Sequence, residues 1–524
     1  MIVHVFKKDV RRLWKEIAIT ALLLGWLTWL DRWRSDSTPG SAEGWLNLLL
    51  PLAWAVLIAL LVHEDVLVGD RQFWVTMPIR ARSLLAAKAL FIAAFIHAPD
   101  LAADATILWG RGFRPYLVLP QLFWKQFLLL VALTLPAVAL ATVVRNTAQF
   151  MIAAIALTAG VVFLNGGFAF DARPWDPWTV DLVRFGIAIT PIAAASVAVM
   201  MLQYARRRVV LSRWIGIGAA GGAAALYALL PVTSTAAVRC ALSPGTPSAG
   251  SLAIQFAPDA PPPVLYRSAS ASRGVLVPLR ISGAPSDVTT RFRQLALEIE
   301  SRDGRRYGWR RYGTVPRWAP TDSSVAAYLI LETPNGPRLY NGRRGGTPNR
   351  LRLEISPRIY DAIKNGPVNI EGKLTAEFVR GEDPTKIPVG DAAAVPGLGI
   401  CSSAIVNARF EEQLLRVVCE SVDEISSFMR VRLIDPATQR DWIAFLGDSS
   451  TPLSHPRTTW LSPINRRATF FHLRDSVEAR DQVPSAVIPN AIVEIAPEHA
   501  TGCTVVRYEL PDVVLSKFSA DTAR

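Results

Sequence analysis

The chain has 524 residues, of which 51% are apolar and 19% are charged, and its 56 Lys and Arg residues against 43 Asp and Glu residues give a formal charge of +13. Long apolar stretches without a charge recur before Val232, and they are long enough to cross a hydrocarbon core of about 30 Å. These features exclude a wholly soluble protein. They also exclude a simple nucleic-acid-binding protein, which gathers its charge on a polar surface.

Seven apolar segments predict a membrane α-helical bundle of about seven transmembrane helices in residues 1–232. The first segment is short, but Trp14 and Trp33 flank it as interfacial anchors, and Lys15 lengthens the usable span by snorkelling. A signal peptide is the alternative for this segment; a retained helix is favoured because no clear small-residue cleavage site follows it. The segments are residues 17–30, 45–62, 83–108, 127–144, 150–170, 185–204 and 214–232.

Lys and Arg residues beside these segments predict the orientation of the chain. Five of them precede the first segment, three follow the second, one follows the fourth and four follow the sixth, whereas the intervening loops form a weaker basic set. The more basic loops belong in the cytoplasm. The N-terminus is therefore expected in the cytoplasm, and an odd number of crossings places everything after Val232 outside.

The loop between the second and third segments is polar and acidic at its start, aromatic in its middle and basic before the next helix. Because Pro78 disfavours a helical conformation for the residue before it, a short helix lying along the membrane surface should end there. Such a helix offers a partner a side-on contact. The residues that carry this pattern are Glu64, Asp70, Arg71, Phe73, Trp74, Pro78, Arg80, Arg82, Leu84, Leu85 and Lys88.

This pattern resembles that of ABC-2 type ABC transporter permeases, the membrane subunits of bacterial exporters. In that family the second membrane helix ends in an acidic residue, followed by an aromatic-x-x-x-Pro pattern, a basic pair and a Leu-rich start of the next helix with a Lys. The resemblance continues more loosely through Gly112-Phe113, Leu135-Pro136 and Arg145-Asn146. A seventh span and a large outer region depart from the six spans usual in the family.

The resemblance implies a permease in the bacterial cytoplasmic (inner) membrane, energised by a separate cytoplasmic ABC ATPase that docks on residues 70–82 together with the basic N-terminus. A second permease copy or a homologue, membrane lipid and an envelope partner of the outer region are the other expected partners. The chain has no Gly-x-x-x-x-Gly-Lys-Ser/Thr motif, so energy would enter through the partner. We expect no cofactor, metal or enzymatic activity in this chain. The alternative is a membrane-anchored extracytoplasmic binding or sensing protein without transport activity.

His97, Asp100 and Asp104 recur at three and four residues, which places them on one face of the third helix. Charges inside a membrane often line a pathway or pair within the bundle. The interpretation favoured by the sequence is that both aspartates sit in water at the outer interface, because Asp104 lies only four residues from Leu108. A metal site is disfavoured because nothing completes a set of ligands.

The region after Val232 changes to period-two alternation, which predicts an all-β region with two immunoglobulin-like sandwiches. The expected organisation is a linker at residues 233–254, a sandwich at 255–382, a second linker at 383–398 and a second sandwich at 399–524. The expected strands are residues 275–281, 295–300, 326–332, 351–355, 368–378, 413–419, 429–435, 442–446, 491–496 and 504–510.

All four cysteines lie after Val232, where the charge bias places the chain outside the cytoplasm and disulfides persist. Four cysteines allow three connectivities. Cys401 with Cys419 is preferred because a separation of 18 residues suits neighbouring strands, which leaves Cys240 with Cys503. Zinc is the competing use, but no closely spaced cysteine pair and no nearby histidine cluster supports it.

Overall fold

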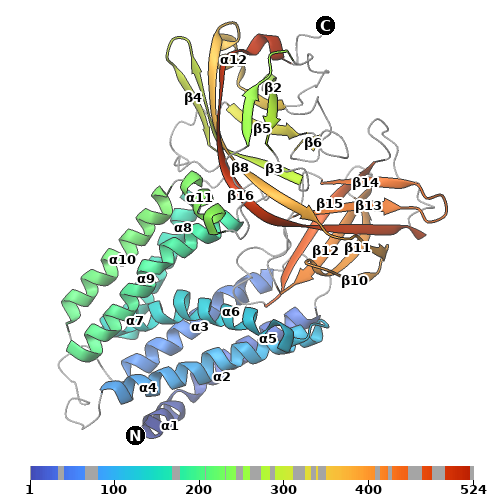
Figure 1. The fold of residues 1–524 in the computed structure, drawn as a ribbon. Helices are drawn as coiled ribbons and strands as arrows, with labels where there is room; N and C mark the ends of the chain where they lie inside the picture. The colour runs from blue at the N-terminus through green and yellow to red at the C-terminus, as the bar shows by residue number, and fades with distance from the viewer. Residues whose placement is uncertain are drawn as a thin grey trace.

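The computed structural model describes residues 2–33, 41–64, 81–167, 178–206, 208–230, 232–242, 252–259, 273–283, 289–310, 325–331, 338–339, 350–407, 413–422, 428–446, 463–474 and 490–519. Helices occupy the first half of the chain, and antiparallel strands dominate the second half (Figure 1). The helical half comprises α1 (Ile2–Arg12), α2 (Trp14–Trp33), α3 (Ser41–His63), α4 (Ala81–Ile92), η2 (Ala93–His97), α5 (Ala98–Gly110), η3 (Pro115–Val118), α6 (Leu119–Leu129), η4 (Leu130–Thr134), α7 (Leu135–Val143), α8 (Thr147–Gly167), α9 (Trp178–Arg206), α10 (Val209–Leu229) and α11 (Val232–Leu242).

Helices lie at all seven expected positions, but fewer of them meet the length and hydropathy of a membrane span. Within the described ranges, four do so: Arg82–Gly110, Pro115–Val143, Gly186–Tyr204 and Val209–Leu226. A fifth arises if α1 and the start of α2, which meet at a bend of 73°, count as one span. Two further apolar helices are shorter. The described residues therefore support about four spans and membrane insertion, and they do not confirm seven.

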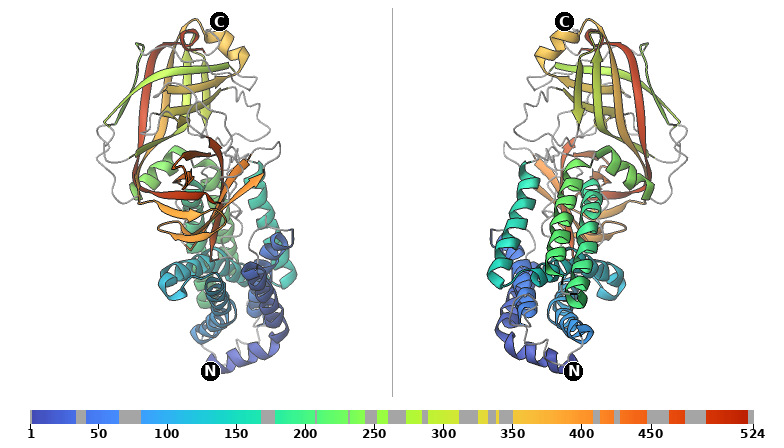
Figure 2. Two further views of the ribbon diagram at one scale, coloured as in Figure 1. Left: turned by 90° about the vertical axis from the view of Figure 1, so that its right-hand side faces the viewer. Right: turned by 90° about the vertical axis from the view of Figure 1, so that its left-hand side faces the viewer.

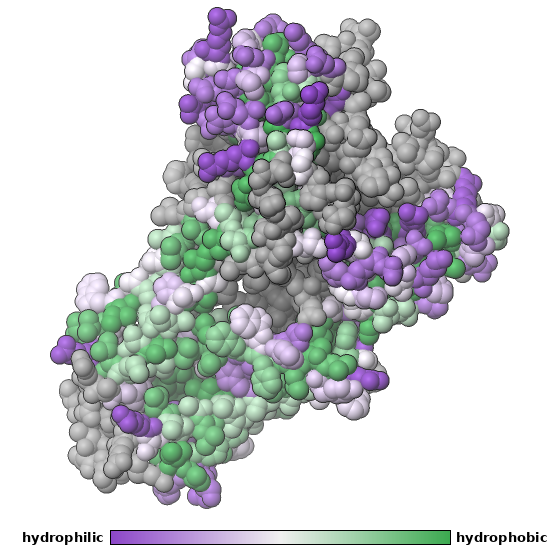
Figure 3. Space-filling model, viewed as in Figure 1, coloured by the Kyte–Doolittle hydropathy of each residue, from purple (hydrophilic) through white to green (hydrophobic). Residues whose placement is uncertain are grey.

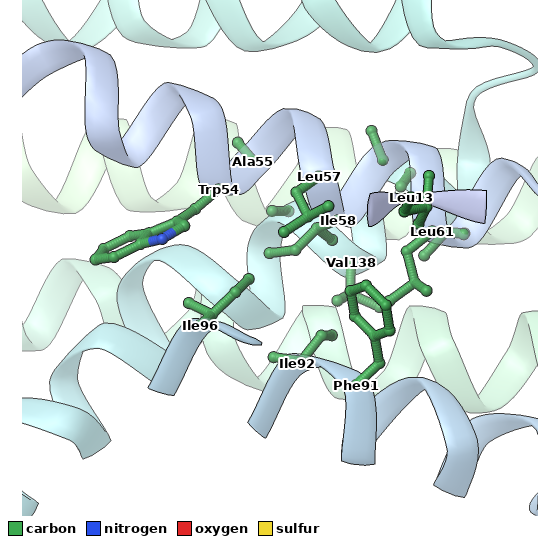
Figure 4. Close-up of a cluster of buried hydrophobic side chains, with 14 of the residues drawn as sticks. Leu13, Trp54, Ala55, Leu57, Ile58, Leu61, Phe91, Ile92, Ile96 and Val138 are labelled. Atoms are coloured by element: carbon green, nitrogen blue, oxygen red, sulfur yellow. The ribbon is translucent and has the colours of Figure 1, made fainter. Parts of the chain in front are cut away.

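The centre of the helical half is a cluster of buried apolar side chains between α3 and the helices opposite it. Trp54 and Ile58 of α3 point toward Phe91 of α4 and Ile96 of η2 (Figure 4). Trp54 is only 1% exposed. The cluster also includes Val5 of α1, so the first helix is packed against the bundle although it is bent away from α2.

Two of the apolar helical segments, Arg82–Gly110 and Pro115–Val143, are called rods below. The π-helical turn η2 interrupts the first rod, and η4 interrupts the second. Each is followed by a proline near the start of the next helix, Pro99 and Pro136. A proline lacks the N–H that would bond the carbonyl four residues earlier and its ring clashes with that carbonyl. In both rods that carbonyl lies within the π turn, so the wider turn relieves the conflict. The helical conformation therefore continues beyond the proline in each rod.

The described strands of the β region form two antiparallel sheets. The smaller sheet has five strands in the order β1-β2-β7-β5-β6. The larger has eleven, in the order β10-β11-β12-β15-β14-β13-β16-β8-β3-β4, with β9 paired to β16. The strands are β1 (Ala253–Phe256), β2 (Arg273–Ser282), β3 (Thr289–Ser301), β4 (Arg306–Arg310), β5 (Val325–Leu331), β6 (Arg338–Leu339), β7 (Arg350–Ile355), β8 (Pro367–Gly381), β9 (Thr385–Pro388), β10 (Ala392–Val395), β11 (Gly399–Asn407), β12 (Gln413–Ser421), β13 (Phe428–Ile434), β14 (Asp441–Leu446), β15 (Asn465–Arg474) and β16 (Ile492–Val514). A short helix, α12 (Pro357–Ile363), lies between β7 and β8, and the 3-10 turn η7 (Leu515–Phe518) follows β16.

The β region has two hydrophobic cores that share the strand β16. This strand has 23 residues, or about 75 Å at 3.3 Å per residue, which exceeds the length of an ordinary sandwich strand. Val493 belongs to one core, while Val506 and Leu510 belong to the other. The last segment of the expected domain 399–524 returns to pair with β8 in the first core. The immunoglobulin-like arrangement is not confirmed.

Both expected linkers contain regular structure. Residues 233–254 include most of α11, and residues 383–398 include β9 and β10. β9 pairs with β16 and β10 with β11 through backbone hydrogen bonds, which form independently of the Pro and Gly content that suggested a linker. The ten expected strands coincide with observed ones, but the last two expected segments are parts of the single strand β16.

The N-terminus and the β region lie at opposite ends of the helical half (Figure 2). Hydrophobic side chains gather over the helices, whereas hydrophilic side chains predominate on the visible β region (Figure 3). Trp109 and Trp214, for example, are 76% and 67% exposed. An apolar surface of this extent on helices is typical of contact with lipid or with another membrane helix.

Candidate functional site

Only part of the expected ATPase-coupling segment lies within the described residues. Glu64 follows α3, while Arg82 and Lys88 belong to α4. The other residues of that prediction lie outside the described ranges: Asp70, Arg71, Phe73, Trp74, Pro78 and Arg80. The structure can therefore be compared with the prediction at the two ends of the loop.

The helix α1 contacts both ends of this loop. It is amphipathic, with Val5 and Asp9 buried four residues apart, a spacing that puts them on one helix face. Lys7, Arg11 and Arg12 are exposed. The aromatic ring of Phe6 lies 6.3 Å from that of Phe91 and 5.9 Å from that of Phe95, between ring centroids. Apolar packing against α4 and η2 thus holds the basic face of α1 outward.

A buried ion pair joins α1 to α4. The Nζ of Lys88 donates a hydrogen bond of 2.9 Å to Oδ2 of Asp9, and the two side chains are 4% and 0% exposed. The exposed Lys8 lies 3.8 Å from the other carboxylate oxygen of Asp9. A buried charge without its partner is costly, so Asp9 and Lys88 specify how α1 sits on the bundle.

A second ion pair joins α1 to the end of α3. Arg12 lies 2.6 Å from Oε1 of Glu64, and Lys8 lies 3.9 Å from the same oxygen. The neighbouring His63 is held by the backbone carbonyl of Ala141, 3.0 Å from its Nε2. The sequence singled out Glu64 and Lys88 but not their partners, although the single acidic residue within the basic α1 was an available signal.

The expected polar face of the third helix is part of a network across the α5–α6 hairpin. Lys125 of α6 bonds both oxygens of Asp104, at 2.5 and 2.7 Å, and lies 3.3 Å from Asp100. Gln126 donates a hydrogen bond of 2.7 Å to Oδ2 of Asp100. His97 lies 2.9 Å from the amide oxygen of Gln126. These five side chains form one continuous chain of polar contacts.

The π turns carry the inner end of this network. His97 ends η2 and Thr134 ends η4, and the Thr134 hydroxyl lies 3.3 Å from Nε2 of His97. Since the amide oxygen of Gln126 only accepts, Nδ1 of His97 is the donor to it. In the neutral form Nε2 then accepts from the Thr134 hydroxyl. Both ring nitrogens are thus paired.

The expectation that the two aspartates sit in water is wrong for this structure. Asp100 is 1% exposed and Asp104 is 0% exposed. The physical reason is Lys125, which precedes the apolar segment 127–144 and therefore did not enter the hydropathy pattern. If the chain turns back near residue 114, residues equally far from the turn along the sequence lie side by side in the two helices. This relation pairs Asp104 with Lys125 and was the signal available in the sequence.

In the part of the chain that the structure describes, the β region is anchored to the helical half at two places. At one, Arg111 contacts the backbone carbonyl of Asp31 and lies 3.5 Å from Glu420 of β12. Beside it, Leu108 and Leu122 of the hairpin share a buried cluster with Ile464, a described residue just before β15. The turn of the hairpin is thereby packed against the β region.

At the other anchor, α11 is joined to β16 by the disulfide Cys240–Cys503. Arg239 adds an ion pair of 2.7 Å with Glu377 of β8. The structure also contains the disulfide Cys401–Cys419, whose residues are direct partners in the β11–β12 register. Both pairings are those preferred from the sequence.

Within the described part of the chain, no group of three or more His, Cys, Asp or Glu side chains is arranged to hold a metal ion. No family model, no curated protein and no solved structure matches the chain.

Proposed function

We propose that the chain is the membrane-spanning permease subunit of an ABC-type exporter, energised by a separate cytoplasmic ATPase that docks on the loop between α3 and α4. The proposal includes seven membrane spans, a cytoplasmic N-terminus, an extracytoplasmic β region of two sandwich modules, and location in the inner membrane of a bacterium. A second permease copy or a homologue would complete the transporter.

The observation that carries the proposal is the position of α1. Its ion pairs reach Glu64, where the loop begins, and Lys88, in the helix that follows the loop. The exposed face of α1 keeps the basic residues Lys7 and Arg11. A partner bound to this loop would therefore also meet a basic helix that is packed onto the bundle. That arrangement suits the coupling of a conformational change in a soluble ATPase to movement of the membrane helices.

Contacts between helix ends support the proposed topology. Arg111 after α5 contacts Asp31 near the end of α2, beside the β region. Arg213 of α10 donates to the carbonyl of Val143 at the end of α7, at 3.2 Å, and Glu64 after α3 pairs with α1. These contacts are what helices of alternating direction would make if α1 and the β region lay on opposite sides of a membrane.

Exposed apolar side chains on the later helices fit the remaining partners. Ile152 of α8, Met201 of α9 and Val210 of α10 are each 69% exposed. Such side chains favour lipid or the helices of a second permease copy over water. The β region, anchored to the hairpin and to α11, would stand where it can contact an envelope partner or guide substrate.

Co-purification with a candidate cytoplasmic ATPase from the same cell tests the proposal. We expect the ATPase to stay bound to the wild-type chain in detergent, and Phe73→Ala, Pro78→Ala and Glu64→Gln to weaken that association. Glu382→Gln, on the β region, is the matched control and should leave it unchanged. Absence of any bound ATPase, or equal binding by all variants, would overturn the proposal. It would favour the alternative of a membrane-anchored binding or sensing protein.

A further inference from the structure

We propose that Asp100, Asp104 and Lys125 form a proton-binding site within the helical half, in which one proton is held by the carboxylate pair. The site needs only the α5–α6 hairpin and its neighbours, so it stands apart from the question of which ATPase drives the protein.

The proposal begins with the charges of the network. Two carboxylates face a single ammonium group, so the triad carries one uncompensated negative charge when both aspartates are ionised. Both aspartates are buried, and the Lys125 side chain is only 11% exposed. An unbalanced charge in such surroundings is expensive. Uptake of one proton from the aqueous phase converts one carboxylate to a carboxylic acid and makes the triad neutral.

A vacant acceptor shows where that proton fits. Oδ2 of Asp100 accepts from Gln126 and faces Lys125, whereas its Oδ1 is buried and has no hydrogen-bond partner among the described residues. Both oxygens of Asp104 are bonded to Lys125. The carboxylate pair therefore has one oxygen that takes part in no hydrogen bond among the described residues, so the pair can hold a proton without breaking an existing contact.

The buried ion pair between Asp9 and Lys88, which lies on the same rod, differs from the hairpin network in its charge balance. Asp9 and Lys88 are similarly buried, at 0% and 4% side-chain exposure, but one carboxylate there faces one buried ammonium group. Lys8 lies beside the second oxygen of Asp9. That pair is balanced in charge without a proton, although Oδ1 of Asp9, like that of Asp100, has no hydrogen-bond partner among the described residues. The imbalance is a property of the hairpin network and not of buried ion pairs in this chain generally.

Among the described residues, the charged groups on neighbouring elements do not supply the missing positive charge. Asp31 of α2 adds a further negative charge within electrostatic range of Asp104. Arg111 is held by Glu420 and by the backbone of Asp31. His97 is the remaining titratable group of the network; its neutral form satisfies both ring nitrogens through Gln126 and Thr134, so it is the competing location for the proton.

The two π turns explain how such a site can exchange its proton. π turns interrupt the regular hydrogen-bond ladder and often mark functional positions in helices. Here one lies in each rod of the hairpin, at His97 and Thr134, where the network ends. A change in either turn would move His97 relative to Gln126 and so open the chain of polar groups from Asp100 inward. Proton uptake and release would then accompany rearrangement of the hairpin.

Infrared difference spectroscopy on the purified full-length protein in lipid nanodiscs tests the site by counting protonated carboxyl groups through their C=O stretching band. At neutral pH we expect one such group from the network in the wild type, none in Asp100→Asn or Asp104→Asn, and two in Lys125→Met, where both aspartates must be neutralised. The balanced pair supplies the control: Asp9→Asn should leave the carboxyl band unchanged. Two isosteric variants guard against failure of one to fold.

The results that overturn the proposal are equally specific. If Asp100→Asn and Asp104→Asn both leave the band unchanged, the triad holds no proton and is a structural ion-pair network. If the band is absent in the wild type and His97→Gln abolishes proton uptake measured with a pH indicator, the proton resides on His97. Neither measurement involves ATP or an ATPase, so the outcome is independent of the co-purification result.

Discussion

The docking of α1 onto the helical half provides the most direct test of the buried ion pair between Asp9 and Lys88. Lys88→Met removes the ammonium group from the buried ion pair and leaves Asp9 charged, at 0% side-chain exposure. Breaking one side of a buried pair typically costs about 3–5 kcal/mol. Lys8, 3.8 Å away and 47% exposed, offsets about 1 kcal/mol or less, as exposed pairs do. We therefore expect α1 to lose about 2–4 kcal/mol of docking free energy.

This loss converts into an observable rate of labelling. At about 1.4 kcal/mol per tenfold change, the undocked population of α1 should rise by about 30- to 700-fold. Val5 is 8% exposed in the docked helix, so Val5→Cys reports undocking through its reaction with a maleimide. The four native cysteines are all in disulfides and do not interfere. Val3→Cys, at a position 59% exposed, serves as the reference because it gives the labelling rate of a cysteine that docking does not protect.

The double variant Asp9→Leu with Lys88→Met is the decisive control. It removes both charges and replaces them with apolar side chains, which is often neutral or stabilising in a buried position. Protection of the cysteine at position 5 should therefore return. A rise in labelling of less than about threefold in Lys88→Met would contradict the argument. So would a double variant that labels as fast as the single one.

Three further outcomes are expected in the β region. Replacing Cys240 and Cys503 by serine opens a loop of 263 residues and should cost about 5 kcal/mol in unfolding free energy, the upper end for a disulfide; thermal unfolding of the oxidised protein measures it. Gly399→Ala should prevent the adjacent strands from pairing, because its Cβ would lie 2.0 Å from a backbone carbonyl oxygen of β12 at a φ of +84°; circular dichroism detects the loss. The Thr438 hydroxyl and the backbone hold the pKa of Asp435 below its usual value, so its contribution to stability is present above the unfolded-state pKa and disappears as the pH falls through the folded-state pKa. Asp435→Asn should therefore be less stable than wild type at neutral pH and equal to it in strong acid.

Local patterns in the sequence predicted much of the fold, because hydropathy and period-two alternation depend on neighbouring residues. The positions of the apolar helices and of nine observed strands follow from them. Strand partners do not, since pairing joins distant segments. The expected break before residue 504 therefore hid the fact that β16 continues across it and joins the two cores. The same limitation concealed the pairing of β9 and β10 within an expected linker.

The site was predictable to the extent that its residues interrupt an apolar pattern. Glu64 and Lys88 were singled out from the loop pattern, and His97, Asp100 and Asp104 from their helical spacing. Their partners were missed because tertiary packing selects them. Asp9 lies on a helix that packs across the bundle, and Lys125 comes from the other rod of a hairpin. Knowing those partners changes the interpretation of both aspartates from solvated to buried and paired.

Three ion-pair contacts lie along the helical rod Arg82–Gly110 or just past its end. Lys88 near one end fixes α1, Asp100 and Asp104 contact Lys125 farther along, and Arg111 just past the other end contacts Glu420 of the β region. A rigid rod would transmit any displacement of α1 directly to the contact between Arg111 and Glu420. The π turn η2 lies between Lys88 and Asp100, so a bend there would instead separate movement at α1 from movement at the contact with the β region. The same turn carries His97, and it therefore places the mechanical break of the rod at the inner end of the proposed proton site.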